Sequence, residues 1–127
     1  MKITLCGSAR FEEDFHKANL LLTLRGHTVY GLAIYPSAKG GEHKWYSEYE
    51  KILLDLAHLR KISESDAIAV VGDGYIGFST SREILWAQSL EKAIYYFDEN
   101  ESDLLRETFD IATRAANTLR NPSAPKA

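Results

Sequence analysis

Short apolar runs alternate along the chain with longer segments in which apolar residues recur every three or four positions. The short runs are rich in β-branched or aromatic residues, which is typical of buried strands. They predict strands at 3–6, 28–33, 67–71 and 93–97. The longer segments have the spacing of amphipathic helices. They predict helices at 11–25, at 45–62, from about 81 to 90, and from about 102 to 119.

Regular alternation of strands and helices predicts a parallel sheet with helices on both faces and right-handed crossovers. The expected fold class is therefore α/β. More specifically, we expect a Rossmann-like three-layer α/β/α arrangement with a central, mostly parallel sheet of four to five strands. A chain of 127 residues is long enough for one such core. We expect a single domain at 1–120 and a flexible tail at 121–127, where two prolines occur.

The stretch 66–87 combines a predicted buried strand, a glycine-rich turn and the start of a helix. Gly77 and the glycines before it permit backbone conformations that other residues resist. Ser79 or Thr80 is expected to cap the following helix, with Glu83 in its first turn. Free N–H groups at a helix N-terminus attract anions, so this turn can hold a phosphate. Glu83 is then either a surface acid that compensates the helix dipole or a site carboxylate.

A second glycine turn, 7–10, follows the first predicted strand. If the strands at 3–6 and 67–71 are neighbours, both turns open into one crevice at the carboxyl edge of the sheet. The residues expected to converge there are Gly7, Ser8, Arg10, Gly77, Ser79, Thr80 and Glu83. Hydroxyls, glycine turns and an arginine together suit a phosphate. Neither a P-loop nor the dinucleotide fingerprint is present at these turns.

Composition narrows the possible partners. The chain is 45% hydrophobic and 26% charged, and its net charge of -3 argues against a nucleic-acid polymer as partner. No apolar run is long enough to cross a bilayer, so no membrane partner is expected. Cys6 is the lone cysteine, so an internal disulfide is excluded, and we interpret it as a small buried residue. A single cysteine is compatible with the reducing cytoplasm, where we expect the protein. No Cys/His cluster has metal-ligand spacing, so neither a metal nor a cofactor is expected.

Two motifs resemble those of a known superfamily. The segment 79–87, Ser-Thr-Ser-Arg-Glu-Ile-Leu-Trp-Ala, resembles the Gly-Thr-x-x-Glu-Ile-Gly-Tyr/Trp-Ala signature of the nucleoside 2-deoxyribosyltransferase superfamily. That superfamily includes deoxynucleoside 5′-monophosphate N-hydrolases and CMP-type N-hydrolases. The segment 6–10, Cys-Gly-Ser-Ala-Arg, resembles the opening of the monophosphate hydrolases. The resemblance covers roughly residues 2–97, and a small subgroup of bacterial and phage proteins looks most similar.

This resemblance implies an N-glycosidic bond hydrolase or an N-(deoxy)ribosyltransferase acting on a small nucleotide or nucleoside. Glu83 would attack the anomeric carbon of the sugar and form a glycosyl-enzyme ester. Water resolves that ester in a hydrolase, and a second base resolves it in a transferase. Ser79 and its neighbours would hold the 5′-phosphate. The resemblance also implies a homodimer or larger homo-oligomer, because superfamily relatives complete their sites across an interface.

The chain departs from the superfamily pattern at informative positions. The superfamily usually has an aspartate where this chain has His58, eight residues before Asp66. His58 is either the general acid for the departing base or a histidine with no chemistry, and Asp55 lies one helical turn earlier. Leu85 replaces a glycine after the glutamate. These departures keep two alternatives open: a non-catalytic nucleotide-binding or sensing module, and a structural protein of the same fold.

Aromatic and apolar residues near the predicted site have further interpretations. Tyr35 flanks a loop expected over the site, at 34–44, and either stacks on a base or anchors that loop. Tyr75, Phe78 and Trp86 offer apolar surface for a partner subunit. The helix predicted at 45–62 carries one apolar face, formed by Tyr49, Ile52, Leu53, Leu56, Leu59 and Ile62.

Overall fold

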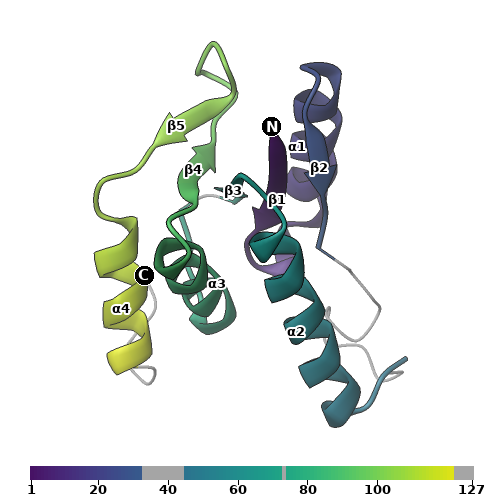
Figure 1. Cartoon of the computed structure of the whole chain (residues 1–127), viewed down its shortest axis with the longest axis vertical. Coiled ribbons are helices and arrows are strands. Elements are labelled where there is room, and N and C mark those ends of the chain that lie inside the picture. The colour runs from purple at the N-terminus through teal and green to yellow at the C-terminus, as the bar shows by residue number, and fades with distance from the viewer. Residues whose placement is uncertain (33–44, 73, 122–127) are drawn as a thin grey trace.

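A computed structural model describes residues 1–32, 45–72 and 74–121, and these form a five-stranded sheet with helices on both faces (Figure 1). In chain order the elements are β1 (Lys2–Cys6), the 3-10 turn η1 (Ala9–Phe11), α1 (Glu12–Leu24), β2 (Thr28–Tyr30), α2 (Glu48–Ser63), β3 (Ala67–Val70), α3 (Phe78–Ser89), β4 (Ala93–Phe97), β5 (Leu105–Glu107) and α4 (Ile111–Arg120). None of the helices in these ranges has the length and apolar character needed to cross a membrane.

The sheet has the strand order β2-β1-β3-β4-β5, and only β5 runs antiparallel to its neighbour. One face packs against α2, α3 and α4, and the other packs against α1. The predicted three-layer α/β/α class with a mostly parallel sheet is therefore confirmed. β1 and β3 are direct neighbours, with Ile3 opposite Ala67 and Cys6 opposite Val70. The two glycine turns consequently leave the sheet side by side.

The segment after β4 differs from its sequence prediction. A single helix from about 102 to 119 was expected, whereas the structure forms β5 and starts α4 only at Ile111. Leu104 turns the chain with a φ of 68°, and β5 then pairs along β4 with Leu105 opposite Phe97. Backbone hydrogen bonds to the edge of β4 outweigh the local helical spacing, because an exposed sheet edge offers unpaired donors and acceptors.

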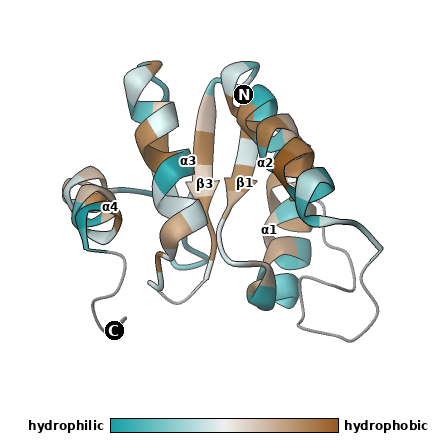
Figure 2. Cartoon of the chain, turned by 90° about the horizontal axis from the view of Figure 1, so that it is seen from below, coloured by the Kyte–Doolittle hydropathy of each residue, from teal (hydrophilic) through white to brown (hydrophobic). Residues whose placement is uncertain are grey.

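Helix α2 places much of its apolar face outside the core. It begins with a capping box between Ser47 and Glu50, at distances of 2.9 and 3.1 Å. Only His58 and Ile62 are buried along the helix. Four apolar residues in its first half and just beyond it are 45% to 68% exposed, namely Tyr49, Ile52, Leu53 and Leu56. This half extends past the sheet (Figure 1), and Figure 2 shows hydrophobic positions along α2.

Helix α3 begins earlier than its sequence suggests. Its first residue is Phe78, its N-cap is Gly77, and no side chain caps it. The expectation that Ser79 or Thr80 is the cap is therefore wrong, because both lie inside the first turn. Glu83 accordingly lies in the second turn, not the first.

Candidate active site

A cavity of about 770 Å³ lies where the turns after β1 and β3 meet α2 and α3. Its volume is in the range of small-molecule sites. The predicted site residues on its wall are Gly7, Ser8, Asp55, His58, Gly77, Ser79, Thr80 and Glu83. Lys51 and Lys61, which the sequence did not mark as site residues, also line it, together with Tyr46 and Tyr75. The expected convergence of the two glycine turns is thus observed.

Two predicted site residues are not on this wall. Arg10 is exposed, and its guanidinium lies 3.8 Å from the centroid of the Tyr75 ring and 5.0 Å from that of Phe11. Since Tyr75 lines the cavity, this stacking holds the positive charge of Arg10 beside the cavity wall. Tyr35 lies outside the described residues, as does the loop in which it was predicted.

Gly7 is required at the end of β1 for a steric reason. Its φ of +150° is unfavourable for other residues, and a Cβ there would lie 2.6 Å from the carbonyl oxygen of Val71. The close approach of the two chain segments brings Ser8 to the cavity. The Ser8 hydroxyl accepts a long hydrogen bond, 3.4 Å, from the backbone N–H of Arg10 and so caps the short turn η1.

Three chemically reactive side chains meet beside the cavity: His58 and Glu83 line it, and the fully buried Cys6 lies behind them. The Sγ of Cys6 lies 3.7 Å from Nε2 of His58, and the same nitrogen lies 3.8 Å from Oε2 of Glu83. Cys6 comes from β1, His58 from α2 and Glu83 from α3. Cys6 is buried, as predicted from its place at the end of a strand, but its contact with His58 was not predicted. No motif could signal it, because the positions are far apart in the chain and only folding brings them together.

Burial keeps this cluster close to neutral. It raises the pKa of Glu83 to about 8, and the negative charge of Asp55 acts in the same direction. It lowers the pKa of His58 to about 4, together with the positive charge of Lys61. Burial and then the charge of Glu83 raise the pKa of the Cys6 thiol well above its ordinary value. A cation placed against the cluster would favour the ionised carboxylate instead.

Two buried polar atoms of the cluster have no hydrogen-bond partner in the described part of the chain. They are Oε1 of Glu83 and Nδ1 of His58, and the backbone of Leu5 acts on the His58 imidazole in the direction that raises its pKa. Leaving a buried polar atom unpaired costs about 1–3 kcal/mol. The cluster therefore has unused capacity for a polar or charged ligand.

Asp55 has a different environment. Its carboxylate lies 3.1 Å from Nζ of Lys51 and 3.5 Å from the guanidinium of Arg82, at the rim of the cavity. Its side chain is 35% exposed, in contrast to 4% for His58 and 13% for Glu83. Asp55 thus lines the predicted site, but its charge is already shared between two cations.

Comparison with known proteins supports the fold. No protein-family model and no curated protein matches the chain. Among solved structures, the chain is similar to the Clostridium botulinum CMP N-glycosidase BcmB, with a TM-score of 0.51 and 19% sequence identity. The alignment covers 74% of this chain and 68% of that chain. At this identity the likeness establishes the shared α/β fold and leaves the activity to be argued from the site.

Proposed function

We propose that the protein cleaves the N-glycosidic bond of a nucleotide or nucleoside, with Glu83 as the nucleophile. The observation that carries this proposal is the position of Glu83. Its carboxyl group lies on the floor of a cavity of small-molecule size, between two glycine turns, with one oxygen unpartnered. The fold shared with a CMP N-glycosidase supports the same conclusion.

The proposed reaction uses the carboxylate against a sugar carbon that becomes positively charged. The bond between the anomeric carbon and the base nitrogen breaks, and the base leaves with the electron pair. Glu83 captures the carbon as an ester, which water then hydrolyses. His58 is the proposed proton carrier: the proton of the Glu83 carboxyl group passes to Nε2 of His58, 3.8 Å away, and from there to the departing base, which frees the carboxylate for attack. Asp55 is less suited to carry this proton, since its carboxylate already forms ion pairs with Lys51 and Arg82.

A phosphate of the substrate would bind at the N-terminus of α3. This helix has neither a capping side chain nor an acidic residue in its first turn, so its free N–H groups remain for an anion. Ser8, Ser79 and Thr80 line the same cavity. Lys51 also lines the cavity, where its charge is paired with Asp55 at 3.1 Å. A nucleoside 5′-monophosphate is therefore the proposed substrate class.

The test is a panel of nucleosides and nucleoside 5′-monophosphates, CMP included, with free base followed by chromatography. We expect base release from at least one monophosphate, and release at least about tenfold slower from the parent nucleoside because one charge-assisted contact is lost. If a compound raises the melting temperature but no base is released, the result contradicts the enzyme hypothesis and supports the non-catalytic sensing module. If the protein neither binds any compound of the panel nor releases a base, both the enzyme and the sensing module are contradicted.

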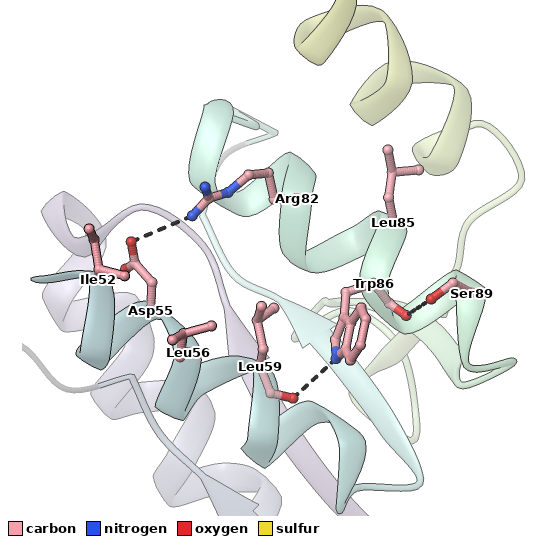
Figure 3. A pocket seen from close by; sticks show the side chains of 8 residues that line it. All are labelled: Ile52, Asp55, Leu56, Leu59, Arg82, Leu85, Trp86 and Ser89. Carbon is pink, nitrogen blue, oxygen red and sulfur yellow. Dashed lines mark hydrogen bonds and ion pairs between the residues drawn. The ribbon is translucent and has the colours of Figure 1, made fainter.

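We also propose that two copies pair through the apolar surface formed by α2 and α3. A groove of about 460 Å³ between these helices is lined by Ile52, Asp55, Leu56, Leu59, Arg82, Leu85, Trp86 and Ser89 (Figure 3). The indole N–H of Trp86 donates to the carbonyl of Leu59 at 3.2 Å, which fixes the aromatic ring beside the groove. Exposed apolar residues at helical spacing on α2 continue this surface.

A second copy is the proposed occupant of this groove. Asp55 and Arg82 form an ion pair at 3.5 Å on it, so this part of the groove can be covered without leaving either charge unpaired. Asp55 also lines the candidate active site, so the pairing surface is continuous with that site. The resemblance to oligomeric enzymes agrees with this arrangement.

Sedimentation velocity at micromolar concentration tests the pairing. We expect a species of twice the 14.3 kDa chain mass, and a shift to monomer in Leu56→Glu, because a buried charge opposes association. Leu24→Glu is the matched control, since Leu24 is 73% exposed but lies on α1, away from the groove. A monomeric wild-type protein, or equal effects of the two substitutions, would overturn the proposed interface.

A further inference from the structure

We propose that Cys6, His58 and Glu83 form a binding site for a zinc-like divalent cation. This goes beyond the proposed glycosidase, because it gives the same carboxylate a second ligand of different chemistry. The three side chains offer one sulfur, one nitrogen and one oxygen atom, and these atoms all lie within 4.8 Å of one another.

The spacing of the donor atoms is close to that around zinc. Zinc bonds to sulfur at about 2.3 Å and to nitrogen or oxygen at about 2.0–2.2 Å, so tetrahedral donors lie roughly 3.3–3.6 Å apart. The distance from Sγ of Cys6 to Nε2 of His58 is 3.7 Å, and that from the same nitrogen to Oε2 of Glu83 is 3.8 Å. Movements of a few tenths of an ångström, within ordinary side-chain adjustment, would bring these pairs to coordination distance.

Burial and unused polar capacity provide a second, independent observation. His58 is 3% exposed, and its Nε2 faces the other two side chains instead of solvent. Oε1 of Glu83 is buried without a hydrogen-bond partner among the described residues. A bound cation would satisfy the charge of the carboxylate in this water-poor setting, where a lone carboxylate is unfavourable. The cluster therefore has both the donors and the need for a positive ligand.

The donor set selects the class of metal. A thiolate, an imidazole and a carboxylate together suit Zn²⁺ or its spectroscopic substitute Co²⁺, whereas Mg²⁺ and Ca²⁺ prefer oxygen ligands alone. His58 and Glu83 line the cavity, so a fourth coordination position would open towards it. Three protein ligands and one open position are typical of zinc sites that exchange a water or a small ligand.

Metal binding and attack on a sugar would exclude each other. On binding, the Cys6 thiol and any protonated Glu83 carboxyl group release their protons to solvent, and the carboxylate oxygen becomes a metal ligand. It is then no longer free to form an ester. The metal site does not depend on glycosidase activity, since the protein can bind a cation whether or not it cleaves any nucleotide.

The experiment is a titration of the reduced full-length protein with Co²⁺ in the absence of nucleotide. We expect one equivalent to bind and to produce a thiolate-to-cobalt charge-transfer band in the near ultraviolet. Since Cys6 is the lone cysteine of the chain, this band reports on it alone even in the wild-type protein. Zn²⁺ should displace the band stoichiometrically, and excess Mg²⁺ should leave it unchanged.

Variants then assign the other ligands. Cys6→Ser should abolish the band, and His58→Gln or Glu83→Gln should weaken Co²⁺ binding at least about tenfold. His16→Gln is the matched control, because His16 also lies beside a glutamate, Glu12 at 3.6 Å, but on the exposed surface of α1. A wild-type spectrum without the thiolate band, or one that His58→Gln leaves unchanged in a variant with native circular dichroism, would overturn the proposal. Either result leaves the base-release assay unaffected.

Discussion

Replacing Glu83 by glutamine is expected to lower kcat/KM for base release by at least about a thousandfold, because an amide oxygen cannot form the glycosyl ester. Glutamine has nearly the same volume and fits the same buried position. It also removes a carboxyl group whose Oε1 has no hydrogen-bond partner in the described chain, so the variant should stay folded. The loss should therefore appear in kcat, with substrate binding changed much less.

The measurement is initial base release from the best monophosphate of the panel, with a chelator present to keep cations off the carboxylate. Glu13→Gln is the matched control, since Glu13 is an exposed acid in the first turn of α1, and it should leave the rate unchanged. Glu83→Asp keeps the charge but retracts it by one methylene, and should also be slow because attack needs close positioning. If Glu83→Gln released base at the wild-type rate, another residue would have to be the nucleophile.

Replacing Gly7 by alanine is expected to reduce the free energy of unfolding by about 3 kcal/mol or more. The new Cβ would lie 2.6 Å from the carbonyl oxygen of Val71, 3.2 Å from Cγ2 of the same residue and 3.3 Å from the ring of Phe15. The first of these atoms belongs to the backbone of the segment after β3, which cannot move without disturbing the sheet. The turn that carries Ser8 to the cavity would shift with it.

Gly26→Ala separates this clash from backbone strain. Gly26 also has a positive φ, +94°, but an added Cβ there meets nothing within 4 Å. Gly26→Ala should therefore lower the free energy of unfolding by the conformational strain alone, about 1 kcal/mol. Equilibrium urea unfolding measures both values. Equal costs would show that the contact between the two turns does not determine the stability of this region.

The local pattern of apolar residues predicted the strands correctly where the strands are buried and follow one another in the expected order. The strands β1, β3 and β4 were predicted within a residue, because continuous apolar runs of that length fit a covered parallel sheet. The sequence predicted the meeting of Ser8 and Glu83 around one cavity on the condition that β1 and β3 are neighbours, and the strand order of the sheet fulfils that condition.

Local pattern failed where partners distant in sequence decide the outcome. Leu105 was assigned to a helix, yet it pairs with β4 because that strand had an open edge. Leu56 has helical apolar spacing, yet it lies outside the core because this part of α2 extends past the sheet. Spacing along the chain gives the face of a helix but not what covers it.

The amino-acid sequence alone determined the α/β class, the parallel sheet and the two glycine turns that open at its edge, because these depend on short-range spacing and on the conformational freedom of glycine. Only the tertiary structure placed the sulfur of Cys6 and the imidazole of His58 beside Glu83. Their approach requires β1, α2 and α3 to pack together, and the loss of water in that packing, rather than any local motif, gives the three groups their shifted pKa values.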